Sequence, residues 1–308
     1  MSNWNLFFKT MSRTWMVLIA VIALGAISSL MYFSSRAFAR FEVEQFAEAE
    51  LRMAESEIGI RTMEMETAVK MLAALAEKHV NCPDSVFADT HLTVRSLYSH
   101  TTMSVAYIPE YFPKKGRYFE ACSSRMSEDS IYTRQIGSDN HDYTQMEWFQ
   151  NGFSNDECWW SEPYFDDSGA QTCVISCSYP VHNSEGEVVA VACVEMPLDY
   201  LQGLTEYLQT YSDSYYSIRS AEGIDIVRAP GMSNDDKFVT FEKDMDTTGW
   251  KISMAIQENE LIRDFQHVSR ICTVLMFIWF FFLLYVLYRA IKNNKIIIEL
   301  TELSMKKN

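Results

Sequence analysis

The stretch from Asp142 to Leu201 reads DYTQMEWFQNGFSNDECWWSEPYFDDSGAQTCVISCSYPVHNSEGEVVAVACVEMPLDYL, and most of the function of the chain can be argued from it. Two runs in it, Thr172 to Val181 and Glu187 to Met196, are rich in Val, Ile and Cys and flank the turn sequence HNSEG. They are predicted to pair as an antiparallel hairpin. Seven aromatic residues precede the hairpin: Tyr143, Trp148, Phe149, Trp159, Trp160, Tyr164 and Phe165. An aromatic-lined loop over a sheet face predicts a small-molecule pocket.

Short motifs succeed one another in a fixed order along this stretch. They are Asp142-Tyr143, Trp148-Phe149, Trp160-Ser161-Glu162-Pro163-Tyr164, Ser178-Tyr179-Pro180-Val181 and Val194-Glu195-Met196-Pro197-Leu198. Their order and spacing resemble the ligand-binding segment of the extracytoplasmic Cache family, specifically the double-Cache sensor. Residues 216–227 and 248–252 resemble that family's membrane-proximal hairpin and closing strand, so the likeness covers roughly residues 36–270. The resemblance implies an α+β fold with a long N-terminal helix and two PAS-like antiparallel-sheet modules.

Charge is distributed unevenly along the 308 residues. Residues 36–270 carry 19 Lys and Arg against 39 Asp and Glu, whereas the two ends carry 7 against 2. Because the phosphates of nucleic acids attract Lys and Arg, the acidic middle argues against nucleic acid as a partner.

Two uncharged runs predict membrane-spanning helices. Residues 14–35 hold 22 residues without a charge and residues 271–288 hold 18. Each is long enough to cross a hydrocarbon core of about 30 Å at about 1.5 Å per residue. Lys and Arg lie before the first run and after the second, so both termini are expected in the cytoplasm of a bacterial inner membrane. The 235 residues between them, 36–270, would then be extracytoplasmic.

A cleaved signal peptide is the alternative for the first run, because Ala37-Phe38-Ala39 supplies an A-x-A site. The apolar region of a signal peptide is about 7 to 15 residues long, which is shorter than this run. The helical pattern also continues through the supposed cleavage point. An uncleaved anchor is therefore the prediction.

Residues 38–79 contain no Pro and one Gly, and they favour a long amphipathic helix. Leu51, Ile58, Met65 and Leu72 recur every seven residues, with Ala54, Ala68 and Leu75 beside them. This stripe can pack on the domain's own sheet or against a second copy of the chain. The resemblance implies both, along different portions of the helix, and hence a homodimer.

Strands are expected at 102–108 and 117–122, a connecting helix at 198–211, and a second module with strands at 215–220, 224–228, 237–241 and 250–256. A helix at 258–269 leads into the second span. The predicted division is a cytoplasmic N-terminus (1–13), a first span (14–35), the long helix with a membrane-distal Cache module (36–208), a membrane-proximal module (209–270), a second span (271–291) and the start of a cytoplasmic signalling helix (292–308).

The resemblance also implies a binding site. In amino-acid-binding Cache sensors an Arg two positions before the Trp holds the ligand carboxylate, and an acid on the later strand holds the ammonium. Here Met146 occupies the Arg position and Glu195 the acid position, while Trp148, Phe149 and Tyr164 supply aromatic surface. A cationic amine, held by cation–π contact and by Glu195, is therefore favoured over an ordinary amino acid. The predicted ligand-binding set is Trp148, Phe149, Tyr164, Glu195, His141 and Met146. The alternative is that the aromatic residues only pack the fold and Glu195 only caps a helix.

Catalytic and metal-binding patterns are absent from the sequence. It has no G-x-S-x-G, H-E-x-x-H, Walker A or G-x-G-x-x-G motif after a strand, and its cysteines lack zinc-ligand spacing. No enzyme and no cofactor are predicted. Six cysteines lie in residues 36–270, which allows up to three disulfides in 15 pairings that the sequence does not separate.

The sequence predicts a transmembrane receptor that binds a small extracytoplasmic ligand and relays a conformational change. About 20 residues come after the second span, too few for a kinase, phosphatase or cyclase, so the output is expected on a longer chain or on a partner. The alternative is a membrane-anchored extracytoplasmic interaction subunit without a ligand.

Overall fold

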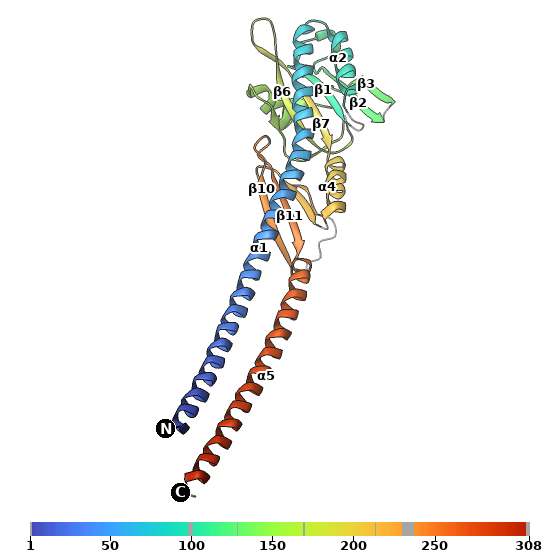
Figure 1. The fold of residues 1–308 in the computed structure, drawn as a ribbon. Helices are drawn as coiled ribbons and strands as arrows, with labels where there is room; N and C mark the ends of the chain where they lie inside the picture. The colour runs from blue at the N-terminus through green and yellow to red at the C-terminus, as the bar shows by residue number, and fades with distance from the viewer. Residues whose placement is uncertain are drawn as a thin grey trace. The chain divides into compact units, whose positions relative to one another are not determined.

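The computed structural model describes residues 2–97, 101–127, 129–168, 170–212, 214–229 and 237–305 (Figure 1). The chain divides into two compact units. One is Ala47–Ile256, and the other combines Met1–Phe46 with Gln257–Asn308. The last three residues of the predicted signalling helix lie outside the described residues.

Long helices begin and end the chain. Helix α1 covers Ser2–Lys78 without a break, and α5 covers Glu258–Met305. Among the residues whose placement is described, no helix is both long enough and apolar enough to cross a membrane. Many side chains of the two predicted spans, 14–35 and 271–291, lie outside the described set.

The stripe of apolar residues on α1 lies inside the unit Ala47–Ile256. Leu51, Ile58, Met65 and Leu72 are each no more than 4% exposed. Burying a side chain of this size contributes about 1.5–3 kcal/mol, so these four residues attach the helix firmly to the sheets. The stripe therefore packs on the chain's own core over this portion of the helix.

Pro83 separates α1 from a second helix, α2 (Pro83–Arg95). Proline is favoured in the first turn of a helix, where its missing N–H has no intrahelical partner to lose. The predicted end of the long helix near Pro83 agrees with the structure, whereas α2 itself was not predicted. The helix packs on strands β1, β2 and β3 of the larger sheet.

That larger sheet has seven strands in the order β3-β2-β1-β7-β6-β4, with β5 also paired to β6. Their bounds are β1 Thr102–Tyr107, β2 Glu120–Ser127, β3 Ser130–Gln135, β4 Trp159–Trp160, β5 Tyr164–Asp166, β6 Thr172–His182 and β7 Val188–Pro197. The pairs between these strands are antiparallel. The predicted β6–β7 hairpin is present, and Gly186 in its turn has φ of 83°, a conformation that favours glycine.

A second sheet lies downstream in the same unit. Helix α4 (Leu198–Ser212) leads to β8 Tyr215–Arg219, β9 Asp225–Val227, β10 Phe238–Asp244 and β11 Lys251–Gln257, in the order β10-β11-β8-β9. Its core includes the fully buried Tyr216 and Ile252. Helix α1 also contacts this sheet, because the Tyr216 hydroxyl donates to Glu50 at 3.1 Å.

The predicted α+β, PAS-like fold with a long N-terminal helix and antiparallel sheets is confirmed. The expected aromatic loop is wrong in one respect, because Trp148 and Phe149 lie on a short helix, α3 (Glu147–Ser154). Cys82, Cys122, Cys158, Cys173, Cys177 and Cys193 are all free thiols, so no disulfide forms among these described cysteines.

Candidate functional site

The two faces of the larger sheet have different roles. Side chains alternate along a strand, so Thr102 and Ser104 of β1 share one face, and Met103 and Val105 share the other. On the first face Ser104 pairs with Cys122 of β2 and with Cys193 of β7. This face is covered by α3 and the segments beside it, which supply the aromatic residues.

Tyr143 anchors that covering layer. Its side chain is fully buried, and its hydroxyl donates to the Tyr107 carbonyl at 2.6 Å. Its ring contacts Phe149, with centroids 5.2 Å apart. Asp142 accepts hydrogen bonds from the Thr144 amide and, at 3.0 Å, from the Tyr118 hydroxyl. The Thr144 hydroxyl also donates to Asp142. These hydrogen bonds lower the pKa of Asp142, and the one from the Thr144 hydroxyl contributes most. The Asp142-Tyr143 motif therefore holds the layer on the sheet.

A small cavity lies between this layer and the sheet. The volume open to the centre of a water molecule is about 10 Å³, which is room for one water. The described residues that line it are Thr102, Ser104, Glu120, Cys122, Ile136, His141, Met146, Trp148, Tyr164, Asp166, Ser168 and Glu195. The structure thus brings five of the six predicted site residues to one cavity.

Phe149 is the predicted residue that does not line the cavity. It lies in a hydrophobic cluster with Tyr143 and Trp148, and its ring meets that of Trp148 edge to face at 5.8 Å. Aromatic pairs in this geometry contribute about 0.5–1.5 kcal/mol beyond their buried area. Phe149 therefore contributes to the cavity only indirectly, by packing against Trp148.

Glu195 is the central polar group of the cavity. It lies on β7 and is 8% exposed, and its Oε1 accepts a hydrogen bond from the Tyr164 hydroxyl at 2.9 Å. Its Oε2 is buried without a hydrogen-bond partner. Burial, followed by the nearby charge of Asp166, raises the pKa of Glu195 well above its ordinary 4.5.

A second carboxyl group, Glu120, faces the cavity from β2. It is 2% exposed, and its Oε2 lies 3.3 Å from His141 Nε2. This contact raises the pKa of His141 above its ordinary 6.5, although partial burial opposes the shift. Glu120 and His141 therefore form an ion pair whenever the imidazole is protonated.

Glu120 and Asp166 were missing from the predicted set. Asp166 lies within the motif-rich stretch 142–201, two residues after Tyr164, so the period of a strand could have placed both on one face. Glu120 carries no such signal. It reaches the cavity only because β2 pairs with β1, a neighbour relation that the sequence does not reveal.

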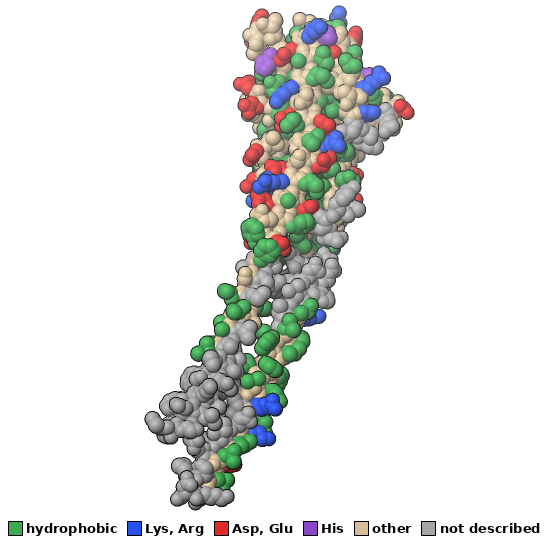
Figure 2. Space-filling view, viewed as in Figure 1, with side chains coloured by type: hydrophobic (Ala, Val, Ile, Leu, Met, Phe, Trp, Pro, Cys, Tyr) green, Lys and Arg blue, Asp and Glu red, His purple; other side chains and the backbone are tan. Residues whose placement is uncertain are grey.

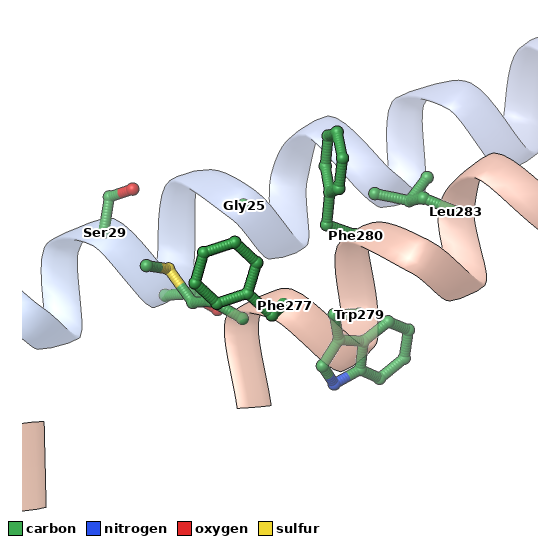
Figure 3. A pocket seen from close by; sticks show the side chains of 8 residues that line it. Gly25, Ser29, Phe277, Trp279, Phe280 and Leu283 are labelled. Carbon is green, nitrogen blue, oxygen red and sulfur yellow. The ribbon is translucent and has the colours of Figure 1, made fainter. Parts of the chain in front are cut away.

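A larger hollow lies elsewhere, in the unit that contains both chain ends (Figure 3). Its volume open to water-sized centres is about 410 Å³, and it lies between α1 and α5. It is lined by Gly25, Ser28, Ser29, Met276, Phe277, Trp279, Phe280 and Leu283. Because this lining is apolar apart from two serines and carries no charge, it offers little to recognise a polar ligand. The smaller cavity is the better candidate site.

Comparisons with known proteins bear on the same region. Residues 93–203 match the family model of the methyl-accepting chemotaxis protein-like, first PDC sensor domain. No curated protein sequence matches the chain. Among solved structures, the extracellular domain of a protein described as a histidine kinase, soHK1S-Z6, matches with TM-score 0.60 at 15% identity, covering 73% of this chain and 98% of that chain.

Two chemoreceptor structures have the same fold. Methyl-accepting chemotaxis protein X matches with TM-score 0.58 at 14% identity, over 70% of this chain and 97% of that chain. The ligand-binding domain of the Campylobacter jejuni chemoreceptor Tlp3, in complex with L-norvaline, matches with TM-score 0.54 at 10% identity, over 70% and 91%.

Residues 93–203 therefore match a sensor domain of the Cache, or PDC, class. Within that class the matching family is the first PDC domain of methyl-accepting chemotaxis protein-like receptors. The resemblance to Cache sensors is confirmed.

Proposed function

We propose that the chain is a transmembrane receptor whose extracytoplasmic domain binds a small amine-containing molecule and relays a conformational change to a cytoplasmic output domain or partner. One observation carries the proposal: Trp148, Tyr164 and Glu195 meet at one cavity on the sensor-fold sheet. Aromatic faces and a carboxylate are the groups that recognise an ammonium. The chain itself is proposed to have no catalytic activity.

The ligand site is tested with the purified full-length chain in detergent. A thermal-shift screen of amines, amino acids and organic acids is expected to yield stabilising compounds. Trp148→Ala is expected to remove the shift, because it deletes aromatic surface from the cavity. Phe165→Ala is the matched control, since Phe165 neighbours Tyr164 in sequence but is 64% exposed. If no compound stabilises the wild type, the receptor proposal fails.

The cavity volume favours one competing function. Room for about one water molecule suits a packed core better than a ligand site, and this supports a membrane-anchored interaction subunit without a ligand. A receptor must therefore open the cavity by moving α3 or the segment that carries Tyr164. A screen in which no compound stabilises the wild type would favour this alternative.

The proposed topology places both termini in the cytoplasm of a bacterial inner membrane and residues 36–270 outside it. The uncharged runs at 14–35 and 271–288 and their basic flanks support it. Reporter fusions in the hairpin turn at Ser184 and after Asn308 are expected to report opposite sides of the membrane. Cytoplasmic signals from both would overturn the topology.

The proposed relay uses α5, which continues from the second sheet into the predicted second span without a Gly-Ser or Pro-rich linker. A flexible Gly-Ser insertion between Arg263 and Arg270 is expected to uncouple binding from output without changing ligand affinity. An insertion that leaves output intact in a receptor carrying its output domain contradicts the rigid-helix relay.

A further inference from the structure

Two cysteines meet on the face of the larger sheet that points away from the small cavity. On β6, Ser176 pairs with Glu195 of β7 and so shares the cavity face, whereas the next residue, Cys177, points to the other side. Cys177 lies opposite Trp160 of β4. Cys158 comes two residues before Trp160, so the period of a strand directs its side chain to the same face as Cys177. The two cysteines are therefore diagonal neighbours across the β4–β6 pairing.

Their thiols interact directly. The Cys177 thiol donates a hydrogen bond to the Cys158 sulfur, and this bond is the largest influence on the pKa of Cys158, which it lowers against the effect of burial. Burial raises the pKa of Cys177, and the bond to Cys158 raises it further. Cys158 is therefore the sulfur that ionises first, while Cys177 keeps its proton.

Helix α1 places a positive charge beside Cys158. After the bond from Cys177, the charge of Lys70 is the next influence that lowers the pKa of Cys158. The charge of Glu66, whose Oε2 lies 3.9 Å from Lys70 Nζ, opposes it. A thiolate stabilised by a neighbouring Lys is nucleophilic, whereas a thiol buried in apolar surroundings is inert.

Access from solvent distinguishes the two sulfurs in the same sense. Cys177 is fully buried, whereas Cys158 is partly exposed. Cys158 also precedes the two-residue strand β4, in the coil that follows α3. A small oxidant from solvent can therefore meet Cys158 but not Cys177. An accessible thiolate next to a second, sheltered thiol is the arrangement of redox-reactive cysteine pairs.

We propose that Cys158 and Cys177 form an oxidation site, at which a hydroperoxide converts the two thiols into a disulfide bond. The Cys158 thiolate attacks a peroxide oxygen and the O–O bond breaks, which leaves a sulfenic acid on Cys158. The departing alkoxide or hydroxide takes up the proton that Cys158 had released. The Cys177 sulfur then attacks the Cys158 sulfur, the S–O bond breaks, and the departing hydroxide leaves as water with the proton of Cys177. Two thiols lose two electrons in total, and one peroxide gains them.

The disulfide requires a local movement only. The two sulfur atoms must approach from hydrogen-bond contact to about 2.05 Å. Cys158 can make this approach because it lies in the coil before β4 and not inside a strand. Oxidation then fixes the start of β4 on β6 by a covalent bond and removes the thiolate beside Lys70.

The other cysteines of the larger sheet are placed less favourably. Cys173 is four residues before Cys177 on the same extended strand, about 13 Å away. Cys122 and Cys193 both pair with Ser104, so they lie on the cavity face of the sheet. The pairing Cys158–Cys177 is therefore the one that this sheet favours.

The test uses the purified full-length chain in detergent, first reduced and then treated with hydrogen peroxide. Peptide mass spectrometry is expected to show a Cys158–Cys177 cross-link that dithiothreitol reverses. Cys177→Ser removes the second thiol, so dimedone should label the sulfenic acid of Cys158 at least tenfold more than in the wild type. Lys70→Met should slow the cross-link about threefold or more, because the thiolate loses its neighbouring charge. Cys173→Ser, at an exposed cysteine, is the control and should leave the cross-link unchanged.

Two results on the wild-type chain overturn the inference: Cys158 and Cys177 both remaining reduced under peroxide, or either of them forming its disulfide with a different cysteine. Neither depends on the folding of a variant. Equal dimedone labelling of Cys158 in the wild type and in Cys177→Ser also overturns it, because Cys177 would then not react with the sulfenic acid. The site lies on the opposite face of the sheet from the ligand cavity, so these outcomes leave the proposed function untouched.

Discussion

Glu195 couples the stability of the domain to pH. In the unfolded chain its carboxyl loses its proton near the ordinary pKa of 4.5, whereas in the folded chain burial and Asp166 keep it protonated to higher pH. Between these two pKa values the native state holds one more proton, so the free energy of unfolding falls as pH rises. The contribution is therefore largest below pH 4.5 and is lost as pH rises through the folded pKa.

Glu195→Gln is expected to remove this dependence, because an amide of nearly the same shape does not ionise. We expect wild-type stability to fall by on the order of 1–3 kcal/mol between pH 5 and pH 8, beyond any fall in the variant. Urea denaturation at several pH values measures the difference. Glu187→Gln should keep the wild-type slope, and parallel slopes for wild type and Glu195→Gln would contradict the assignment.

Predicting the site residues from the sequence depended on local spacing. Trp148, Tyr164 and Glu195 belong to short motifs with fixed order, and all three line one cavity in the structure. Phe149 was misplaced because adjacent residues on a helix point in different directions, about 100° apart, and the segment had been taken as a loop. Glu120 depends on a contact between strands far apart in sequence, which no local pattern encodes.

Among the secondary-structure elements, helix α3 rests on the sheet through Gly152. A Cβ atom at this position would lie 2.6 Å from Val191 Cγ1 and 2.7 Å from Ser178 Cβ, closer than real contacts allow. The absence of a side chain thus sets how near the helix lies to β6 and β7. Trp148 is one turn earlier on the same helix, so the position of the cavity wall depends on this approach.

Gly152→Ala is expected to destabilise the protein by about 1–3 kcal/mol, because the helix must move away from the sheet. Gly203→Ala in α4 is the matched control, since no atom lies within 4 Å of its added Cβ. That change should be neutral or stabilise the helix by up to about 1 kcal/mol. Thermal or urea unfolding of both variants is the measurement, and equal stabilities would show that α3 does not depend on close packing.

Apart from helix α2, the elements that the sequence did not reveal are short. The β6–β7 hairpin and α4 are long and strongly patterned, and they were predicted nearly to their ends. Strands β4 and β5 are only two and three residues long, so they show no period and exist because they add to the edge of β6. Strand β3 is polar and lies at the other sheet edge, where pairing with β2 outweighs its weak apolar pattern.

At the scale of the whole molecule, Trp160 joins three parts of the unit Ala47–Ile256. Its Nε1 donates to Glu66 of α1 at 3.0 Å, and its ring meets Trp250, next to β11, edge to face at 5.2 Å. Tyr164 of the cavity lies four residues further along the chain. Trp160 therefore connects the segment that precedes Tyr164 to both the long helix and the second sheet.

A double-mutant cycle on Trp160→Phe and Glu66→Ala tests this junction. Phenylalanine keeps the ring contact and removes the hydrogen bond, which should cost about 1 kcal/mol. We expect a coupling energy of about 0.5–1.5 kcal/mol from urea denaturation. The pair Phe165→Leu and Glu66→Ala is the control and should be additive, because Phe165 is largely exposed. An additive Trp160 cycle contradicts the contact.

A further whole-molecule feature is the outward face of α1. Met53, Ile60 and Met71 are 45%, 48% and 43% exposed, and their spacing of 7 and 11 residues places them on one side of the helix. In the upper part of Figure 2, charged side chains are interspersed with apolar ones. We propose that this outward stripe, opposite the buried one, is the part of the helix that pairs with a second copy.

Ile60→Glu is expected to weaken dimerisation of the full chain at least tenfold, because it places a charge in an apolar contact. Sedimentation equilibrium in detergent measures the change. Leu92→Glu on α2 is the control, since Leu92 is 61% exposed and lies away from the stripe. A wild-type chain that remains monomeric at high concentration would contradict the proposed pairing through the outward stripe.

Helix α1 carries Glu50, which bonds to the second sheet, and Glu66, which bonds to Trp160 beside the first. Each residue added to a helix turns the remainder of that helix by about 100° and advances it by about 1.5 Å. A single insertion or deletion between these two positions would therefore swing one set of contacts away while the other stayed in place. Evolution can replace the side chains of this segment one by one, but its length is fixed by two folded partners at once, so related sequences should differ there by substitution and not by gaps.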